Sequence, residues 1–214
     1  PGRSRAASTG CRGACSVIWS ATSIMDDIVK QALAKWPNVP SCTGWLMLDR
    51  RGNWRMRDEA AQASGAPGTP IRHEALLGFI NRNYAADEHG QWFFQNGPQR
   101  VYVELGYTPW VVRLSADAAG QLSLTDQAGG TFEPTAVFVD DEGGILFVDG
   151  STPPRVAVLH DHDLEIFSDH ASLGDDSMSG VFRWNHGIKL PLQSVQRNEV
   201  AARFGFVESP AANA

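Results

Sequence analysis

The sequence predicts an α+β fold made of two related small subdomains of antiparallel strands with packed helices. Two stretches of eleven residues, 87–97 and 140–150, align without a gap and share an acidic turn, a glycine and an apolar strand. Each is followed by an Arg-Val-x-Val segment, at 100–103 and 155–158. Runs rich in Val, Phe and Trp predict strands, whereas helical spacing of apolar residues occurs in short segments. A repeated hairpin therefore indicates two related subdomains with a cleft between them.

Length and composition are those of a globular protein with a sizeable core. The chain has 214 residues, of which 43% are hydrophobic and 20% are charged, and its formal net charge is −6. Its basic residues are scattered, so the concentrated positive surface that binds nucleic acid is not expected. No apolar run approaches the roughly 20 residues of a membrane helix. We expect a soluble cytoplasmic protein that binds neither nucleic acid nor membrane.

The first 24 residues differ from the rest of the chain. They include Arg, Ser, Ala and Gly but no acidic residue, and two of the three cysteines, Cys11 and Cys15, lie among them. With Cys42 these form no Cys-x-x-Cys pair, which suits a reducing compartment. We interpret 1–24 as a disordered extension, and a targeting arm is the alternative, because transit peptides are rich in Arg and Ser and poor in acids.

An N-terminal α+β subdomain is expected at 25–114. Val29, Leu33 and Trp36 fall at helical spacing and Pro37 ends that helix. The expected elements are a helix at 26–36, a hairpin of 44–48 and 53–57, a loop at 60–68, a helix from 69 to 83, and strands at 91–95, 100–105 and 109–114. We expect the last three strands to form an antiparallel meander.

A C-terminal β-rich subdomain with a terminal helix is expected at 115–207, followed by a tail at 208–214. Its expected elements are strands at 121–125, 135–139, 144–148, 155–159 and 164–167, a helical turn at 171–176, a hairpin of 181–184 and 188–190, and a helix at 194–204. Gly205 is expected to end that helix, because glycine readily adopts the left-handed conformation of a C-cap.

A cluster of histidines and aspartates lies between two of these expected strands. On a strand, His160 and His162 would face the same way and could bind one metal ion together with His170. The alternative is a polar hairpin tip whose side chains face water and shape the turn. The hairpin tip explains the cluster without a metal, so we expect no metal and no cofactor. A metal-dependent hydrolase that uses the three histidines is the alternative function.

Aromatic and arginine residues gather around the repeated hairpins and form the candidate binding site. Its members are Trp92, Arg100, Tyr102, Glu104, Trp110 and Arg155. Arginine beside aromatic rings suits a planar anion such as a nucleotide, since guanidinium pairs with phosphate while the rings stack on the base. The alternative is structural, for example a cross-sheet ion pair of Arg100 and Glu104. No Gly-x-Ser-x-Gly, P-loop or Rossmann pattern occurs, so no catalytic residue is assigned.

Four short motifs occur in a characteristic order. They are Leu48-Asp49-x-x-Gly52-x-Trp54, Gly90-Gln91-Trp92-Phe93, Pro98-x-Arg100-Val101-x-Val103-Glu104 and Pro109-Trp110-Val111-Val112. Over roughly 25–192 the chain thereby resembles an uncharacterised proteobacterial family known only as a domain of unknown function. The resemblance implies an α+β fold with a duplicated core, a C-terminal half like a pleckstrin-homology domain, and an interdomain surface that binds a nucleotide-like ligand in signalling.

We therefore expect a bacterial, non-catalytic module that binds a nucleotide-like small molecule in an interdomain groove. A structural adaptor that offers strand edges to another protein is a further alternative.

Overall fold

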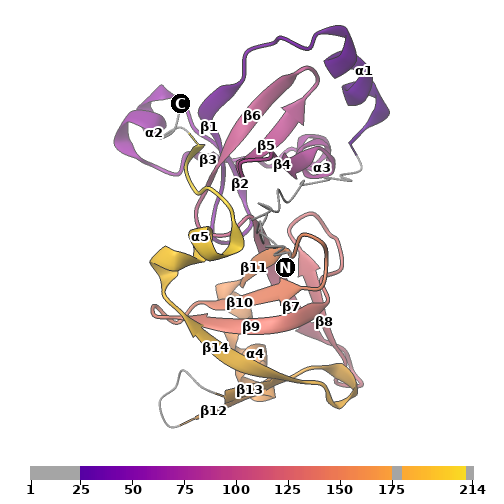
Figure 1. Ribbon diagram of the computed structural model, residues 1–214, viewed down its shortest axis with the longest axis vertical. Helices are drawn as coiled ribbons and strands as arrows, with labels where there is room; N and C mark the ends of the chain where they lie inside the picture. Colours follow the sequence, from indigo (N-terminus) through magenta and orange to yellow (C-terminus); the bar gives the residue numbers. More distant parts are fainter. Residues whose placement is uncertain (1–24, 175–179, 211–214) are drawn as a thin grey trace, which may run out of the picture.

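The computed structural model describes residues 25–174 and 180–210, which form two lobes stacked along the long axis of the molecule (Figure 1). Each lobe is built on one sheet, of six strands in the first lobe and eight in the second. Helices accompany both sheets. The predicted α+β fold with two strand-rich parts is confirmed.

The first lobe carries a sheet with the order β3-β2-β1-β6-β5-β4. Its strands are β1 (Cys42–Leu48), β2 (Trp54–Met56), β3 (Thr69–Pro70), β4 (Tyr84–Ala86), β5 (Trp92–Asn96) and β6 (Gln99–Leu105). Its helices are α1 (Asp27–Lys35), α2 (Glu59–Ser64) and α3 (Glu74–Arg82). The helix α1 buries Val29 on one face, as its apolar spacing predicts.

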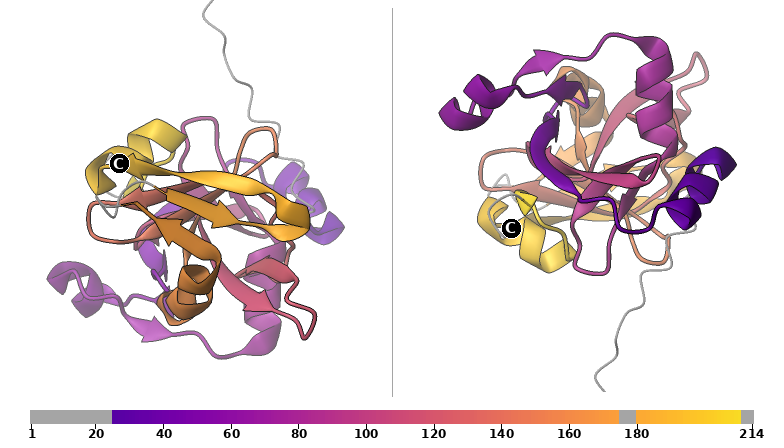
Figure 2. Two further views of the ribbon diagram at one scale, coloured as in Figure 1. Left: turned by 90° about the horizontal axis from the view of Figure 1, so that it is seen from below. Right: turned by 90° about the horizontal axis from the view of Figure 1, so that it is seen from above.

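The second lobe carries a sheet with the order β12-β13-β14-β9-β10-β11-β7-β8. Its strands are β7 (Trp110–Ala116), β8 (Leu122–Asp126), β9 (Pro134–Asp140), β10 (Ile145–Asp149), β11 (Val156–Leu159), β12 (Ala171–Leu173), β13 (Gly180–Arg183) and β14 (Lys189–Val195). Its helical segments are η1 (Asp161–Asp163), α4 (Leu164–His170), η2 (Asn185–Gly187), η3 (Arg197–Glu199) and α5 (Val200–Phe204). In the view from below in Figure 2, the hairpin of β13 and β14 crosses in front of the lobe.

The second sheet curls so that the turn of the β13–β14 hairpin meets β8, the edge strand at the far end of the sheet order. Asn185, in the turn between β13 and β14, accepts a hydrogen bond from the backbone N–H of Leu122 at 2.8 Å and donates one to its carbonyl at 2.7 Å. Leu122 begins β8, the strand at the opposite end of the sheet order. The side chain of Asn185 therefore satisfies backbone groups of an edge strand that would otherwise be open to pairing.

The same five-stranded arrangement occurs in both lobes. In the first lobe, β1 and β2 form a hairpin, β4, β5 and β6 form an antiparallel meander, and β6 pairs in parallel with β1. In the second lobe, β7 and β8 form the hairpin, β9, β10 and β11 form the meander, and β11 pairs in parallel with β7. The aligned sequences at 87–97 and 140–150 thus occupy equivalent places in the two arrangements.

The Asp-x-x-Gly pattern of the repeat is a hairpin turn that recurs beyond the aligned pair. Within the described residues it occurs five times, starting at Asp49, Asp87, Asp117, Asp126 and Asp140. In each copy the aspartate carboxylate accepts hydrogen bonds from the backbone N–H groups two and four residues later. The glycine has a positive φ of 75° to 86°. Backbone geometry therefore explains the motif.

The lobes share a hydrophobic core. One cluster combines Leu46, Trp92 and Val103 of the first sheet with Leu146 and Val158 of the second. A second cluster lies on the other face of the second sheet, inside its curl. The central strands β9, β10 and β11 are consequently buried on both faces, which accounts for their continuous apolar sequences.

Two expectations for the first lobe are wrong. The expected loop at 60–68 contains α2, because the Asp58 side chain caps the helix and Gly65 ends it in the left-handed conformation. The expected helix start at 69–70 is instead the edge strand β3, where a proline without an N–H is tolerated. The helix α3 begins at Glu74 behind His73, whose imidazole accepts the backbone N–H of Leu76.

The expected meander of 91–95, 100–105 and 109–114 holds only for its first two strands. The third, β7, pairs with β8 and β11 of the second sheet. The chain therefore passes between the sheets at 106–109, and the boundary that we place at 114/115 falls inside β7. The division into subdomains itself stays a prediction.

Three expectations for the second lobe also differ from the structure. The segment 164–167 belongs to α4 instead of a strand, since short apolar runs do not distinguish the two states and burial of Phe167 on one face favours the helix. Residues 171–173 form β12 instead of a helical turn, and 175–176 lie outside the described residues. The helix expected from 194 begins later, because β14 continues through Val195, and Gly205 caps α5 as predicted.

Candidate functional site

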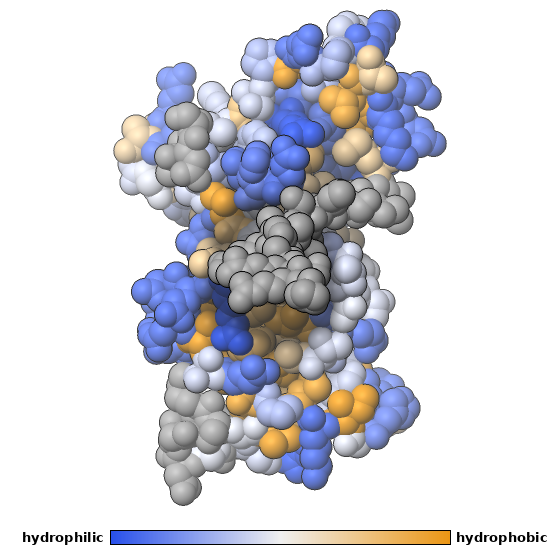
Figure 3. Space-filling view, in the orientation of Figure 1, coloured by the Kyte–Doolittle hydropathy of each residue, from blue (hydrophilic) through white to orange (hydrophobic). Residues whose placement is uncertain are grey.

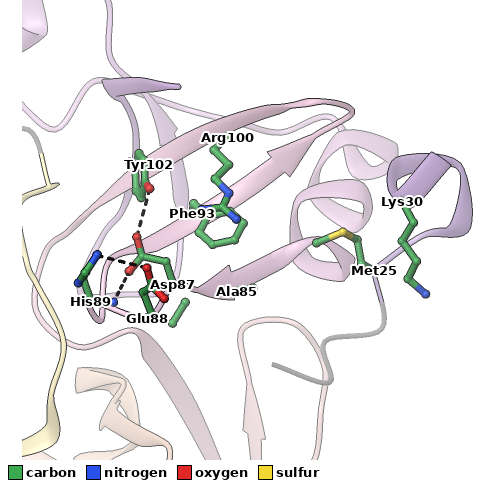
Figure 4. A pocket seen from close by; sticks show the side chains of 10 residues that line it. Met25, Lys30, Ala85, Asp87, Glu88, His89, Phe93, Arg100 and Tyr102 are labelled. Carbon is green, nitrogen blue, oxygen red and sulfur yellow. Dashed lines mark hydrogen bonds and ion pairs between the residues drawn. The ribbon is translucent and has the colours of Figure 1, made fainter. Parts of the chain in front are cut away.

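A pocket of about 640 Å³ opens on the first lobe (Figure 4). Its walls come from the start of α1, from β4 and the turn that follows it, and from the neighbouring strands β5 and β6. All lining residues lie between Met25 and Tyr102. The volume falls in the range of roughly 300–1,000 Å³ that is usual for small-molecule sites.

Arg100 and Phe93 form the floor of this pocket. The guanidinium carbon of Arg100 lies 4.6 Å from the centre of the Phe93 ring, and the Tyr102 ring meets the same ring edge to face at 6.0 Å. Phe93 is buried, whereas Arg100 is exposed. Among the described residues, no carboxylate forms an ion pair with Arg100. An exposed guanidinium over an aromatic ring, without a carboxylate partner among the described residues, is therefore available to an anion.

The alternative ion pair of Arg100 with Glu104 does not form. Both residues belong to β6, and Glu104 lies opposite Met47 of β1, beyond the residues that line the pocket. Arg100 lies opposite Gln95 of β5.

The acidic wall of the pocket is the turn between β4 and β5. The Tyr102 hydroxyl donates a 3.1 Å hydrogen bond to Oδ2 of Asp87, whose Oδ1 is occupied by the backbone of the turn. Burial and the negative charge of Asp87 raise the pKa of Tyr102, and Arg100 lowers it by less. The phenol therefore keeps its proton. Glu88 and His89 of the same turn are exposed at the rim.

Arg155, the counterpart of Arg100 in the repeat, has a different environment. It bonds to Oδ2 of Asp149 at 2.6 Å and to Oδ2 of Asp126 at 2.9 Å, and its guanidinium lies over Trp110 and Phe132. Both carboxylates are buried, with 6% or less of their side-chain surface exposed. The guanidinium is thus committed to buried carboxylates. Within residues 25–174 and 180–210, the rings and carboxylates that contact Arg155 differ from those that contact Arg100.

Trp92 and Trp110 belong to the core that joins the two sheets. Their ring centres are 5.6 Å apart in an edge-to-face contact, and both pack against Tyr84. Trp92 faces away from the pocket because neighbouring Phe93 faces into it, as alternation along a strand requires. The described residues therefore bring Arg100 and Tyr102 together at one pocket, and leave Trp92, Glu104, Trp110 and Arg155 outside it.

His160 precedes η1, His162 lies in it, and His170 ends α4. The expected strand, on which His160 and His162 would face the same way, is therefore absent from this part of the described chain. The Nδ1 atom of His160 accepts the backbone N–H of His162 at 3.1 Å, and Nδ1 of His170 contacts the carbonyl of Ile166. Burial and the charge of Arg113 lower the pKa of His160, which favours the neutral imidazole. No group of three or more His, Cys, Asp or Glu side chains suited to a metal is found in 25–174 and 180–210.

Sequence reasoning missed Phe93 and Asp87, which form the floor and wall of the pocket. The alternation of β5 was a usable signal, since it places Phe93 on the same sheet face as Tyr102. The contribution of Lys30 from α1 had no sequence signal, because it depends on how that helix packs on the sheet.

Comparison of the sequence and fold with known proteins identifies the family of this chain. The family described as "Protein of unknown function (DUF2946)" matches residues 25–211. The chain belongs to this family. A comparison with curated proteins finds no match. Two solved structures are similar. A DUF1285 family protein from Silicibacter pomeroyi DSS-3 is 17% identical, and the match covers 76% of this chain and 87% of that chain with a TM-score of 0.48. A DUF1285 family protein from Shewanella baltica OS155 is 11% identical, and the match covers 58% of this chain and 91% of that chain with a TM-score of 0.36.

The family description names no activity, and no described helix is long and apolar enough to cross a membrane. On the face shown in Figure 3, hydrophobic residues appear in small groups among hydrophilic ones.

We expect stability to fall steeply in acid. Burial raises the pKa of Asp149 and Asp163, but hydrogen bonds from Ser151 to the first and from Arg113 to the second outweigh burial, so both pKa values lie below normal. A carboxyl with a depressed pKa stabilises the fold above its unfolded pKa of about 3.9, and this contribution is lost as pH falls. The urea concentration at the midpoint of unfolding, measured at about pH 7, 5 and 3, should fall most between about pH 5 and pH 3. An unchanged midpoint at about pH 3 would contradict this.

Proposed function

We propose that this protein is a non-catalytic module that binds a nucleotide-like anion in the pocket of the first lobe. The observation that carries the proposal is the exposed guanidinium of Arg100, which lies on the Phe93 ring without a carboxylate partner among the described residues. Such a group offers paired N–H donors to phosphate, while the half-buried ring of Tyr102 in the same pocket supplies an aromatic surface for a base. Lys30 also lines the pocket, and its ammonium is paired with Asp27 at 3.2 Å.

The pocket replaces the interdomain groove as the proposed location. Trp92 and Trp110, which we expected to line that groove, are packed in the core, and Arg155 holds two buried carboxylates. The recurrence of the five-stranded arrangement further supports descent by duplication. Arg100 of the first copy has no carboxylate partner among the described residues, whereas the equivalent Arg155 of the second copy pairs with two, so we infer different roles for the two arginines.

Adding AMP or GMP is expected to raise the melting temperature, whereas adenosine and guanosine are expected to have little effect. A ligand present at 100 times its Kd stabilises by about 2.7 kcal/mol. The variant Arg100→Met should weaken nucleotide binding about 10- to 100-fold, because a hydrogen bond to a charged group contributes about 1.5–3 kcal/mol. Thermal-shift titration of the wild type and the variant checks both expectations.

The matched control is Arg113→Met, which removes an arginine of the second lobe whose guanidinium is paired with Asp163. Its nucleotide affinity should equal that of the wild type once its own change in stability is subtracted. Equal nucleotide and nucleoside responses, or an affinity unchanged by Arg100→Met, would refute the proposed function.

A further inference from the structure

The C-terminal residues return from the second lobe to the first and attach beside the pocket. The backbone N–H of Val207 donates to the carbonyl of Gly90 at 2.9 Å, and Val207 forms a parallel bridge with Gln91. The N–H of Leu105 donates to the carbonyl of Glu208 at 2.8 Å. The expected tail therefore begins with residues that pair with the first sheet.

The same segment is anchored in the second lobe, where α5 lies at the boundary between the lobes (Figure 1). Arg197 forms an ion pair with Glu142 at 3.3 Å, and its guanidinium carbon lies 3.9 Å from the centre of the Tyr107 ring. Phe204 packs edge to face on Phe138 at 5.5 Å. We call residues 197–208 the C-terminal strap, because they connect the second lobe to the first.

The turn between β4 and β5 contacts both the pocket and the strap. On the pocket side, Asp87 accepts the hydroxyl of Tyr102. On the strap side, Gly90 is buried against Gly205, so that a Cβ atom at Gly90 would collide with the carbonyl oxygen of Gly205. Within the turn, the carboxylate of Asp87 fixes the N–H of Gln91, the residue that bridges Val207. Two hydrogen bonds thus connect Tyr102 to Gln91 within the turn, and a third, from Val207 to Gly90, connects the turn to the strap.

We propose that the pocket and the C-terminal strap are coupled through this turn, so that a ligand in the pocket strengthens the attachment of the strap to the first lobe. This inference rests on the proposed function. A ligand that holds Tyr102 and the turn in place favours the conformation in which Gly90 and Gln91 bind Val207. By linkage, attachment of the strap raises the affinity for the ligand by the same factor.

Hydrogen exchange in the ligand-free protein tests the coupling directly. The variant Tyr102→Phe removes one hydrogen bond to the turn, and the amides of Val207 and Leu105 should then exchange about three- to tenfold faster, the ratio expected for a single hydrogen bond. The amide of Phe132, which bonds to Leu124 in the second lobe, is the reference and should keep its rate. In the control Ser115→Ala, which removes a side-chain pair of the second lobe, Val207 and Leu105 should exchange as in the wild type.

Unchanged exchange of Val207 and Leu105 in Tyr102→Phe would overturn the coupling. AMP added to the wild type should slow both amides relative to Phe132, and bound AMP without this slowing would also overturn it. A failure of AMP to bind counts against the proposed function alone, since the Tyr102→Phe comparison needs no ligand. The two inferences can therefore fail separately.

Discussion

The variant Arg155→Met should lose about 3–5 kcal/mol of unfolding free energy, because it leaves Asp126 and Asp149 buried without their positive partner. Arg155 also donates to the carbonyl of Thr131, so one side chain holds three segments of the second lobe together. Urea denaturation followed by tryptophan fluorescence measures the loss. A variant too unstable to fold at 25 °C would agree with the upper end of this range.

Arg100→Met is the matched control, since Arg100 lies near the start of β6, the equivalent strand of the first lobe, and also lies over an aromatic ring. It has no carboxylate partner among the described residues, so its removal should change the unfolding free energy by less than about 1 kcal/mol. Comparison of the two variants distinguishes an arginine that stabilises the fold from one that is available to bind a ligand. If Arg155→Met were as stable as Arg100→Met, the structural assignment of Arg155 would be wrong.

The variant Gly90→Ala should be destabilised by about 3–5 kcal/mol and should release the strap. Alanine at a φ of 75° is strained by about 1–2 kcal/mol, and its Cβ would collide with the carbonyl of Gly205. Moving the strap breaks the hydrogen bonds of Val207 and Leu105, at about 1 kcal/mol each, and exposes part of Phe206. Denaturation gives the total, and faster amide exchange at Val207 identifies the strap as its source.

Gly143 provides the control because it occupies the equivalent position of the equivalent turn. Its φ is 81°, and no atom lies within 4 Å of a Cβ built there. Gly143→Ala should therefore be destabilised by strain alone, about 1–2 kcal/mol. Similar losses in the two variants would show that the strap contributes little at Gly90.

The strands and turns could be predicted because their signals are local. The Asp-x-x-Gly turn needs only an aspartate that bonds to its own backbone and a glycine with positive φ, so hairpins such as β9–β10 are legible in the sequence. The segments 59–64 and 164–170 were assigned wrongly because each is short and its helix depends on a cap or on burial of one side chain. The transfer of β7 to the second sheet has no local signal.

The candidate site was only partly predictable for the same reason. Arg100 and Tyr102 were found from their residue types and alternation, and they do meet at the pocket. Arg155 shares the Arg-Val-x-Val segment with Arg100, yet it pairs with Asp149, six residues away, and with Asp126, 29 residues away. The residue of the first repeat that aligns with Asp149 is Asn96, so part of this difference is local, whereas the contact with Asp126 depends on the fold.

The most direct test of the central claim is to map the AMP-induced shifts of backbone amide resonances by NMR. We expect the shifted amides to gather at 85–89, at Phe93 and at 100–102, with smaller changes at Val207 transmitted through the turn. Shifts centred instead on Trp110, Phe132 and Arg155, or no shift at saturating AMP, would contradict the claim.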